Sequence, residues 1–273
     1  MSLRVINTVS DLESVHGLTF VPTMGALHDG HLSLVQAGLA HGDEVIMSIF
    51  VNPKQFAPGE DFESYPRTLE QDLALAESAG TAVVFAPDVD TMYPPNDAQP
   101  GPPLPAVATE PGLEDGHRPQ FFGGVCTVVA RLLDLVRPRR MIMGEKDYQQ
   151  LLVLQAMVDA DPNRWPDLDV IGAPTIRADD GLALSSRNAY LDPDQRLRAL
   201  GLSRALHEAQ LESTVDAAEA RMVSVLEQHD LDVDYAVVRD DRTLMPVTGA
   251  CRGHRGLIAA GLDDVRLIDN MAM

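Results

Sequence analysis

Short apolar runs alternate with segments of helical periodicity through the first two thirds of the chain, and this alternation constrains the fold most strongly. Apolar runs of strand length lie at residues 18–21, 44–50, 81–85, 140–143 and 170–173. Helical patterns lie between them, at about 31–39, 68–79, 124–136 and 148–159. Consecutive strand–helix units place their strands in parallel, because each helix packs back onto the sheet. The sequence therefore predicts an α/β fold, a parallel sheet with helices on both faces.

The pattern changes after residue 173. Two amphipathic helical segments, about 193–211 and 215–228, precede short strands near 235–238 and 256–260. We therefore expect two domains: residues 1–174, which contain the parallel sheet, and residues 175–273, which form a smaller α+β domain. Residues 94–119 contain eight prolines and little periodicity, so they are predicted to be a loop, and a loop of that length is usually functional or mobile.

Composition excludes several classes of protein. The chain of 273 residues can bury a sizeable core, and it has no apolar run of 18 residues, so no membrane span is expected. A net charge of −20 disfavours a nucleic-acid partner, which calls for a basic patch. Cys126 and Cys251 lie far apart without metal-ligand spacing, and the N-terminal residues lack the apolar core of a signal peptide. A cytoplasmic protein is expected, with Cys126 as a buried small hydrophobe.

Two histidines flank a glycine where the first strong strand passes into a helix, in the segment Val21–His31. His28 and His31 would stand at the helix N-terminus, where free N–H groups and the helix dipole attract a phosphate. Gly30 lets a nucleotide approach the backbone. The alternative is a polar turn with hydrogen-bonded histidines.

A second motif, Ser48–Phe56, also follows a strand and turns at Asn52. Gln55 offers an amide donor and acceptor suited to a hydroxy acid. The alternative is a plain surface turn.

The third motif, Met143–Gln150, holds one of only two lysines among 21 basic residues. Lys146 is a compact cation suited to phosphate oxygens. Asp147 fits either a ribose contact or a helix cap, and the two are compatible. Gln150 lies within one turn of that helix start, facing the predicted cleft.

The fourth motif, Asp180–Asn188, lies on the predicted interdomain loop. Ser185, Ser186 and Arg187 together make a suitable phosphate clamp. A simple interdomain loop with a helix cap is the alternative.

In this order, the four motifs resemble the pantothenate synthetase (pantoate–β-alanine ligase) family, with similarity from about Val21 to Asn270. The family elements are Pro-Thr-Met-Gly-x-Leu-His-x-Gly-His, Phe-Val-Asn-Pro-x-Gln-Phe, Gly-Glu-Lys-Asp and Ser-Ser-Arg-Asn. His-x-Gly-His alone would indicate only the wider nucleotidyltransferase superfamily. The resemblance implies a Rossmann-like N-terminal domain, a C-terminal lid and a homodimer.

The implied reaction is ATP-dependent adenylation of pantoate followed by attack of β-alanine, with AMP and pyrophosphate released. His31 would be the proton-donating catalytic residue, assisted by His28 and Lys146. Gln55, Gln150 and Asn52 would bind pantoate or β-alanine. The implied ATP-binding residues are Met24, Gly25, Ala26, Leu27, His28, Asp29, Gly30, His31, Gly144, Glu145, Lys146, Asp147, Ile176, Leu184, Ser185, Ser186 and Arg187. Mg²⁺ would bridge phosphate oxygens, with no protein ligand assigned to it and Asp72 a distant candidate at most.

Three features depart from the family pattern. Phe121 stands where the family usually has histidine, Lys54 stands where an apolar residue is usual, and residues 159–169 look like a surface elaboration. Two rival functions share part of the pattern. A nucleotidyltransferase acting on a phosphate ester would need no Gln55 or Gln150, and a non-catalytic nucleotide-binding protein would not need both histidines.

Overall fold

The larger of two β-sheets is entirely parallel, as predicted. The computed structural model describes residues 3–13, 15, 17–95 and 100–273. The strand order is β1-β4-β3-β2-β5-β6, all pairs being parallel. The strands are β1 (Arg4–Ile6), β2 (Thr19–Thr23), β3 (Val45–Ile49), β4 (Val83–Phe85), β5 (Arg140–Gly144) and β6 (Asp169–Ala173). Strand β1 is an addition that the apolar pattern did not predict.

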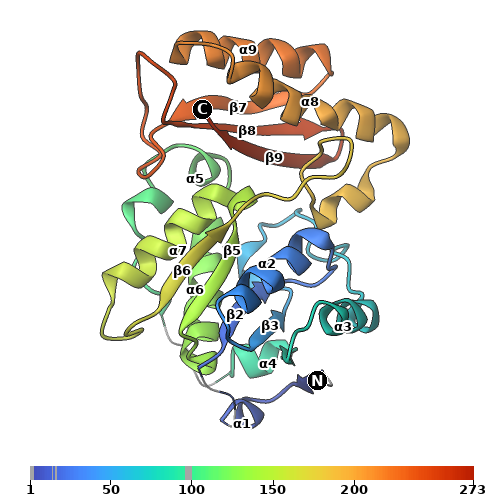
Figure 1. Cartoon of the computed structure of the whole chain (residues 1–273), viewed down its shortest axis with the longest axis vertical. Coiled ribbons are helices and arrows are strands. Elements are labelled where there is room, and N and C mark those ends of the chain that lie inside the picture. Colours follow the sequence, from blue (N-terminus) through green and yellow to red (C-terminus); the bar gives the residue numbers. More distant parts are fainter. Residues whose placement is uncertain (1–2, 14, 16, 96–99) are drawn as a thin grey trace.

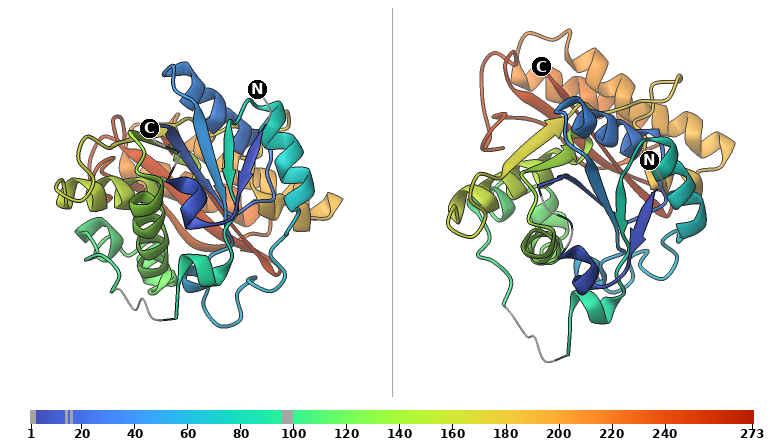
Figure 2. Two further views of the ribbon diagram at one scale, coloured as in Figure 1. Left: turned by 90° about the horizontal axis from the view of Figure 1, so that it is seen from below. Right: turned by 60° about the horizontal axis from the view of Figure 1, so that its bottom comes forward.

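Helices cover both faces of this sheet (Figure 2). The main ones are α2 (Asp29–Ala40), α3 (Leu69–Ser78), α6 (Phe121–Val136) and α7 (Tyr148–Ala160), with single-turn helices α1 (Val9–Leu12), α4 (Val89–Met92) and α5 (Glu114–His117). Alternate strand residues face opposite sides. Phe20 packs into a core with α6 and α7, whereas Val21 packs into a second core with α2 and α3.

The strand order changes direction between β2 and β5. Strand β2 pairs with β3 from Thr19 to Thr23, but its pairing with β5 ends at Phe20. The two strands therefore separate toward their carboxyl ends. In a doubly wound sheet this switch point is where a ligand crevice forms.

A smaller antiparallel sheet lies beyond those carboxyl ends (Figure 1). It consists of β7 (Asp232–Arg239), β8 (Arg255–Leu262) and β9 (Val265–Ala272), and it shares a separate core with α8 (Pro193–Ala209) and α9 (Val215–Gln228). The α+β character predicted for this part is confirmed. Strand β9 was not predicted, because polar Asp269 and Asn270 interrupt its apolar pattern.

One expectation about the segments between elements was wrong. Residues 94–119 are not purely a loop, since they contain the 3₁₀ turn η2 (Ala106–Ala108) and α5; residues 96–99 lie outside the described part. The buried side chain of Leu113 and the Asp115 carboxylate, which accepts the Gly112 and Leu113 N–H groups, order the turn. Residues 159–169 are mostly exposed, as expected for a surface segment, and Trp165 anchors them: it is buried in the core and its indole donates to Asp134.

The helices of the described chain include none long and apolar enough to cross a membrane. Cys126 is fully buried, and burial raises the pKa of its thiol to about 12, which agrees with a purely structural cysteine.

Candidate functional site

A cleft of about 700 Å³ lies between the carboxyl ends of the parallel strands and the antiparallel sheet. All four motifs reach it. Of the site residues expected from the sequence, the following line the cleft: Met24, His28, Gly30, His31, Asn52, Gln55, Gly144, Lys146, Asp147, Gln150, Ile176, Leu184, Ser185, Ser186 and Arg187. Gly25, Ala26, Leu27, Asp29 and Glu145 are predicted site residues that are not among those lining the cleft.

The turn after β2 is held from behind by a buried carboxylate. Gly25 and Ala26 both have positive φ angles, 83° and 49°. The N–H groups of Ala26 and Leu27 donate to Asp72, at 3.0 and 2.8 Å. A Cβ atom at Gly25 would lie 2.9 Å from the Asp72 carboxylate, so glycine is required there. Asp72 thus shapes the turn and is not available as a metal ligand.

The two histidines cap helix α2 with their Nδ1 atoms. His28 Nδ1 accepts from the Gly30 N–H at 3.1 Å, and His31 Nδ1 accepts from the His28 N–H at 3.3 Å. A neutral ring whose Nδ1 is an acceptor carries its proton on Nε2. Both rings therefore offer an Nε2–H donor, and both line the cleft.

Burial keeps both rings uncharged at neutral pH. Burial, and then the positive charge of Lys146, lower the pKa of His28 to about 4. Burial, followed by the charges of His28 and Lys146, lowers the pKa of His31 to about 3. A neutral His31 ring still offers its Nε2–H to the cleft as a hydrogen-bond donor.

Lys146 is positioned through its backbone. It lies in the 3₁₀ turn η3 (Glu145–Asp147), whose Glu145 and Lys146 carbonyls both accept from the Asn270 amide at 2.8 Å. The Glu145 carboxylate points out of the cleft to Arg255, at 2.9 Å. Only a long contact of 3.5 Å joins the Lys146 ammonium to Asp147. The charge of Lys146 acts on both histidine rings, and among the described residues no carboxylate lies closer to its ammonium than Asp147.

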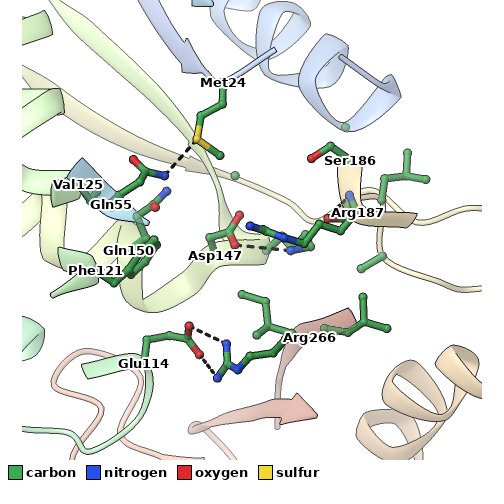
Figure 3. A pocket seen from close by; sticks show the side chains of 18 of the residues that line it. Met24, Gln55, Glu114, Phe121, Val125, Asp147, Gln150, Ser186, Arg187 and Arg266 are labelled. Atoms are coloured by element: carbon green, nitrogen blue, oxygen red, sulfur yellow. Dashed lines mark hydrogen bonds and ion pairs between the residues drawn. The ribbon is translucent and has the colours of Figure 1, made fainter. Parts of the chain in front are cut away.

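Two glutamine amides face the same region. Figure 3 shows Met24, Gln55 and Gln150 along one side of the cleft, with Ser186 and Arg187 along the other. Gln55 Nε2 lies 3.1 Å from the Met24 sulfur, and its Oε1 accepts from Asn52 at 3.1 Å. The Asn52 side chain is only 1% exposed, so it supports Gln55 from behind.

Three arginines that line the cleft are paired with carboxylates of the chain itself. Arg187 pairs with Asp61 through two bonds of 2.9 Å, and Arg118 pairs with Glu60 through two bonds of 2.8 Å. Arg266 binds Glu114 at 2.9 and 2.7 Å (Figure 3). The predicted phosphate clamp at Arg187 is therefore occupied by Asp61 in this structure.

Sequence reasoning missed these acidic partners, because 126 positions separate Arg187 from Asp61 and 152 separate Arg266 from Glu114. The same cluster explains Phe121. Its ring lies 3.9 Å beneath the Arg118 guanidinium and lines the cleft. Lys54, the other unusual residue, places its ammonium 3.8 Å over the Tyr93 ring. In the described part of the chain, no cluster of three or more His, Cys, Asp or Glu could hold a metal ion.

Comparison with known proteins places this geometry in a family. The model of the pantoate–β-alanine ligase family matches residues 3–272. The pantothenate synthetase of Mycobacterium avium is 49% identical over 93% of this chain and 81% of its own. That of Thermus thermophilus is 43% identical over 98% of this chain and 99% of its own, and its crystal structure matches with a TM-score of 0.92, 42% identity and 98% of each chain covered.

A solved structure of the pantoate–β-alanine ligase from Francisella tularensis, described as a complex with βγ-ATP and β-alanine, matches with a TM-score of 0.80 and 30% identity. It covers 99% of this chain and 97% of its own. The family match extends over nearly the whole chain, and both the parallel sheet and the antiparallel sheet are included in it. The chain therefore belongs to the pantoate–β-alanine ligase family.

Proposed function

We propose that this chain condenses pantoate with β-alanine in two steps, through a pantoyl adenylate, and releases AMP and pyrophosphate. The observation that carries the proposal is the cleft at the sheet's switch point. It brings two Nε2–H donors, the Lys146 ammonium and the Gln55 and Gln150 amides together. The family match and the Francisella complex with an ATP compound and β-alanine support the same reaction.

In the first step a pantoate carboxylate oxygen bonds to the α-phosphorus while the bond to pyrophosphate breaks. Negative charge moves onto the phosphoryl oxygens, so donors placed at those oxygens lower the barrier. We assign this role to His28, His31 and Lys146. Both imidazoles are proposed to act through their Nε2–H groups, with His31 as the proton-donating residue at the phosphoryl oxygens and His28 assisting it.

In the second step the amine nitrogen of β-alanine bonds to the acyl carbon, AMP leaves and the amine loses a proton. Gln55 and Gln150 are proposed to hold pantoate through both steps. ATP enters as its Mg²⁺ complex, with the ion as part of the substrate and carried by phosphate oxygens. We further propose that Ser185, Ser186 and Arg187 bind the ATP phosphates, that residues 175–273 act as a lid, and that the enzyme is a cytoplasmic homodimer.

The test is pyrophosphate exchange into ATP with a panel of carboxylic acids. Exchange should depend on pantoate and should not need β-alanine. With ¹⁸O in the pantoate carboxylate, label should appear in AMP after complete turnover. Formation of ADP, or label in inorganic phosphate, would exclude the adenylate. Exchange driven by a phosphate ester instead of pantoate would favour the nucleotidyltransferase alternative.

A further inference from the structure

A tyrosine behind the cleft is tied to Gln55 through one buried amide. Tyr93 follows helix α4 and is not among the residues that line the cleft. Its hydroxyl donates to Asn52 Oδ1 at 2.8 Å. Asn52 Nδ2 in turn donates to Gln55 Oε1 at 3.1 Å. The three side chains form a line of hydrogen bonds that ends at the candidate pantoate site.

The hydrogen-bonding capacity of Asn52 is fully used. Its Oδ1 accepts from Tyr93 and from the Lys54 N–H at 3.2 Å, while its Nδ2 donates to Gln55 and to the Gly124 carbonyl at 3.1 Å. An asparagine amide has two donor hydrogens and an oxygen with two lone pairs, so no position remains for a substrate. We therefore assign Asn52 to the support of Gln55 and not to substrate binding.

This pattern also fixes which end of the Gln55 amide faces the cleft. The Lys54 N–H can only donate and the Gly124 carbonyl can only accept, so the Asn52 amide has one orientation. The Asn52 Nδ2–H then requires an acceptor, which is Gln55 Oε1. Gln55 Nε2 is left pointing to the Met24 sulfur and the cleft. Gln55 thus presents donors, which suit a carboxylate or hydroxyl oxygen.

The surroundings hold Tyr93 as a donor. Its ring packs edge-on against Phe50 at 6.1 Å between centroids, and the Lys54 ammonium lies on its face. Burial raises the pKa of the Tyr93 hydroxyl above its usual value, so it stays protonated throughout the physiological range. Helix α6 closes the arrangement, since a side chain at Gly124 would collide with the Lys54 carbonyl and with the Gln55 backbone.

We propose that Tyr93 is a positioning residue that, through Asn52, sets the Gln55 amide to donate to pantoate. The inference rests on the proposed function for its substrate. Tyr93→Phe keeps the ring and its contact with Lys54 but removes the hydroxyl. Loss of one buried hydrogen bond corresponds to about tenfold in an equilibrium constant. We expect the KM for pantoate to rise by about that factor, with kcat and the KM for ATP within about twofold of the parent.

The matched control is Thr19→Val, which also removes a buried hydroxyl group. The Thr19 hydroxyl donates to Asp43 at 3.2 Å, and neither residue lines the cleft. It should leave all kinetic constants unchanged. The decisive comparison is Tyr93→Phe in a Gln55→Ala background. If Tyr93 acts through Gln55, its effect on the pantoate KM disappears there. An equal effect in both backgrounds, or no effect in the parent, would overturn the proposal.

A spectroscopic readout does not depend on the reaction. The Gln55 side-chain amide signals, assigned by their absence in Gln55→Ala, should exchange with solvent more rapidly in Tyr93→Phe than in the parent and in Thr19→Val. Unchanged exchange would contradict the proposal even if the enzyme used another acid. A parent enzyme without pantoate-dependent exchange of pyrophosphate would instead refute the proposed function.

Discussion

The two walls of the cleft hold their positive charges in opposite ways. On the wall formed by the ends of β2 and β5, Lys146 has only a 3.5 Å contact with Asp147, and two neutral histidines stand beside it. On the facing wall, Arg187 and Arg266 each make two bonds to a carboxylate of the chain. The first wall is ready for an anion, whereas an anion on the second wall must displace a partner.

The arginine pairs also differ among themselves. The side chains of Arg187 and Arg266 are equally exposed, at 30% and 29%, so the difference lies in their carboxylates. Asp61 is 24% exposed, and its pairing with Arg187 therefore contributes little and exchanges readily. The Glu114 side chain is 7% exposed and also accepts from the Tyr235 hydroxyl at 2.8 Å. Losing a partner from a buried pair is costly. We infer that Arg187 can exchange Asp61 for a phosphate, while Glu114 of α5 stays bonded to Arg266 of β9.

The largest expected effect is that of Lys146→Arg. A planar guanidinium needs more room than an ammonium and would displace the phosphates, and a shift of about 1 Å can reduce a rate by on the order of 100-fold. Adenylate formation measured before the steady state should fall by about that factor, while thermal melting stays near the parent. A rate close to the parent would mean that the preformed wall supplies only charge.

The next largest effect is the difference between the stability that the protein loses when Glu114 is neutralised and the stability that it loses when Asp61 is neutralised. Glu114→Gln should lower the free energy of unfolding by about 2 kcal/mol, because an amide nitrogen then replaces one buried carboxylate oxygen and faces the Arg266 donors. Arg266 keeps its bond to Asp234, at 2.7 Å, so the loss reports on Glu114 and not on an isolated arginine. Asp61→Asn, the matched exposed case, should cost less than about 1 kcal/mol. Denaturant titration of both variants measures this. Equal losses would remove the distinction between an exchangeable and a permanent arginine pair.

The pH dependence of stability tests the neutral histidines. The unfolded chain binds these protons near pH 6.5, but the folded chain binds them only near pH 4 at His28 and pH 3 at His31. Stability should therefore fall as the pH decreases from about 6.5 toward 4.

His28→Asn keeps an acceptor for the Gly30 N–H and should reduce the loss between pH 7 and 5 by about 2 kcal/mol. Unfolding curves at the two pH values give the comparison. A variant that loses as much stability as the parent would show that His28 is not held neutral.

The smallest expected effect is that of Phe121→His. The ring lies under Arg118, so a histidine can keep that contact and add a hydrogen-bond donor to the cleft. The KM for pantoate or for β-alanine should fall by about twofold, and the KM for ATP should not change. A twofold change corresponds to less free energy than one full hydrogen bond contributes. No change for either substrate would mean that this loop does not contact them.

The sequence predicted what local patterns encode. Strand β2 and helix α2 follow from the apolar residues at 18–21 and 31–39, and the four motifs did reach one cleft because parallel strands end at one edge. The sequence could not predict the bond of Asp72 to Ala26 or that of Tyr93 to Asn52, because these partners are 46 and 41 positions apart along the chain. Strand β1, with only three residues, is defined by its pairing with β4 rather than by its own pattern.

The most direct test of the contrast between the walls is a crystal structure with a non-hydrolysable ATP analogue and pantoate. We predict that Arg187 leaves Asp61 and binds a phosphate oxygen, while the bonds of Asp72 to Ala26 and Leu27 and of Arg266 to Glu114 persist. An intact Arg187–Asp61 pair with the phosphates bound elsewhere would contradict the account.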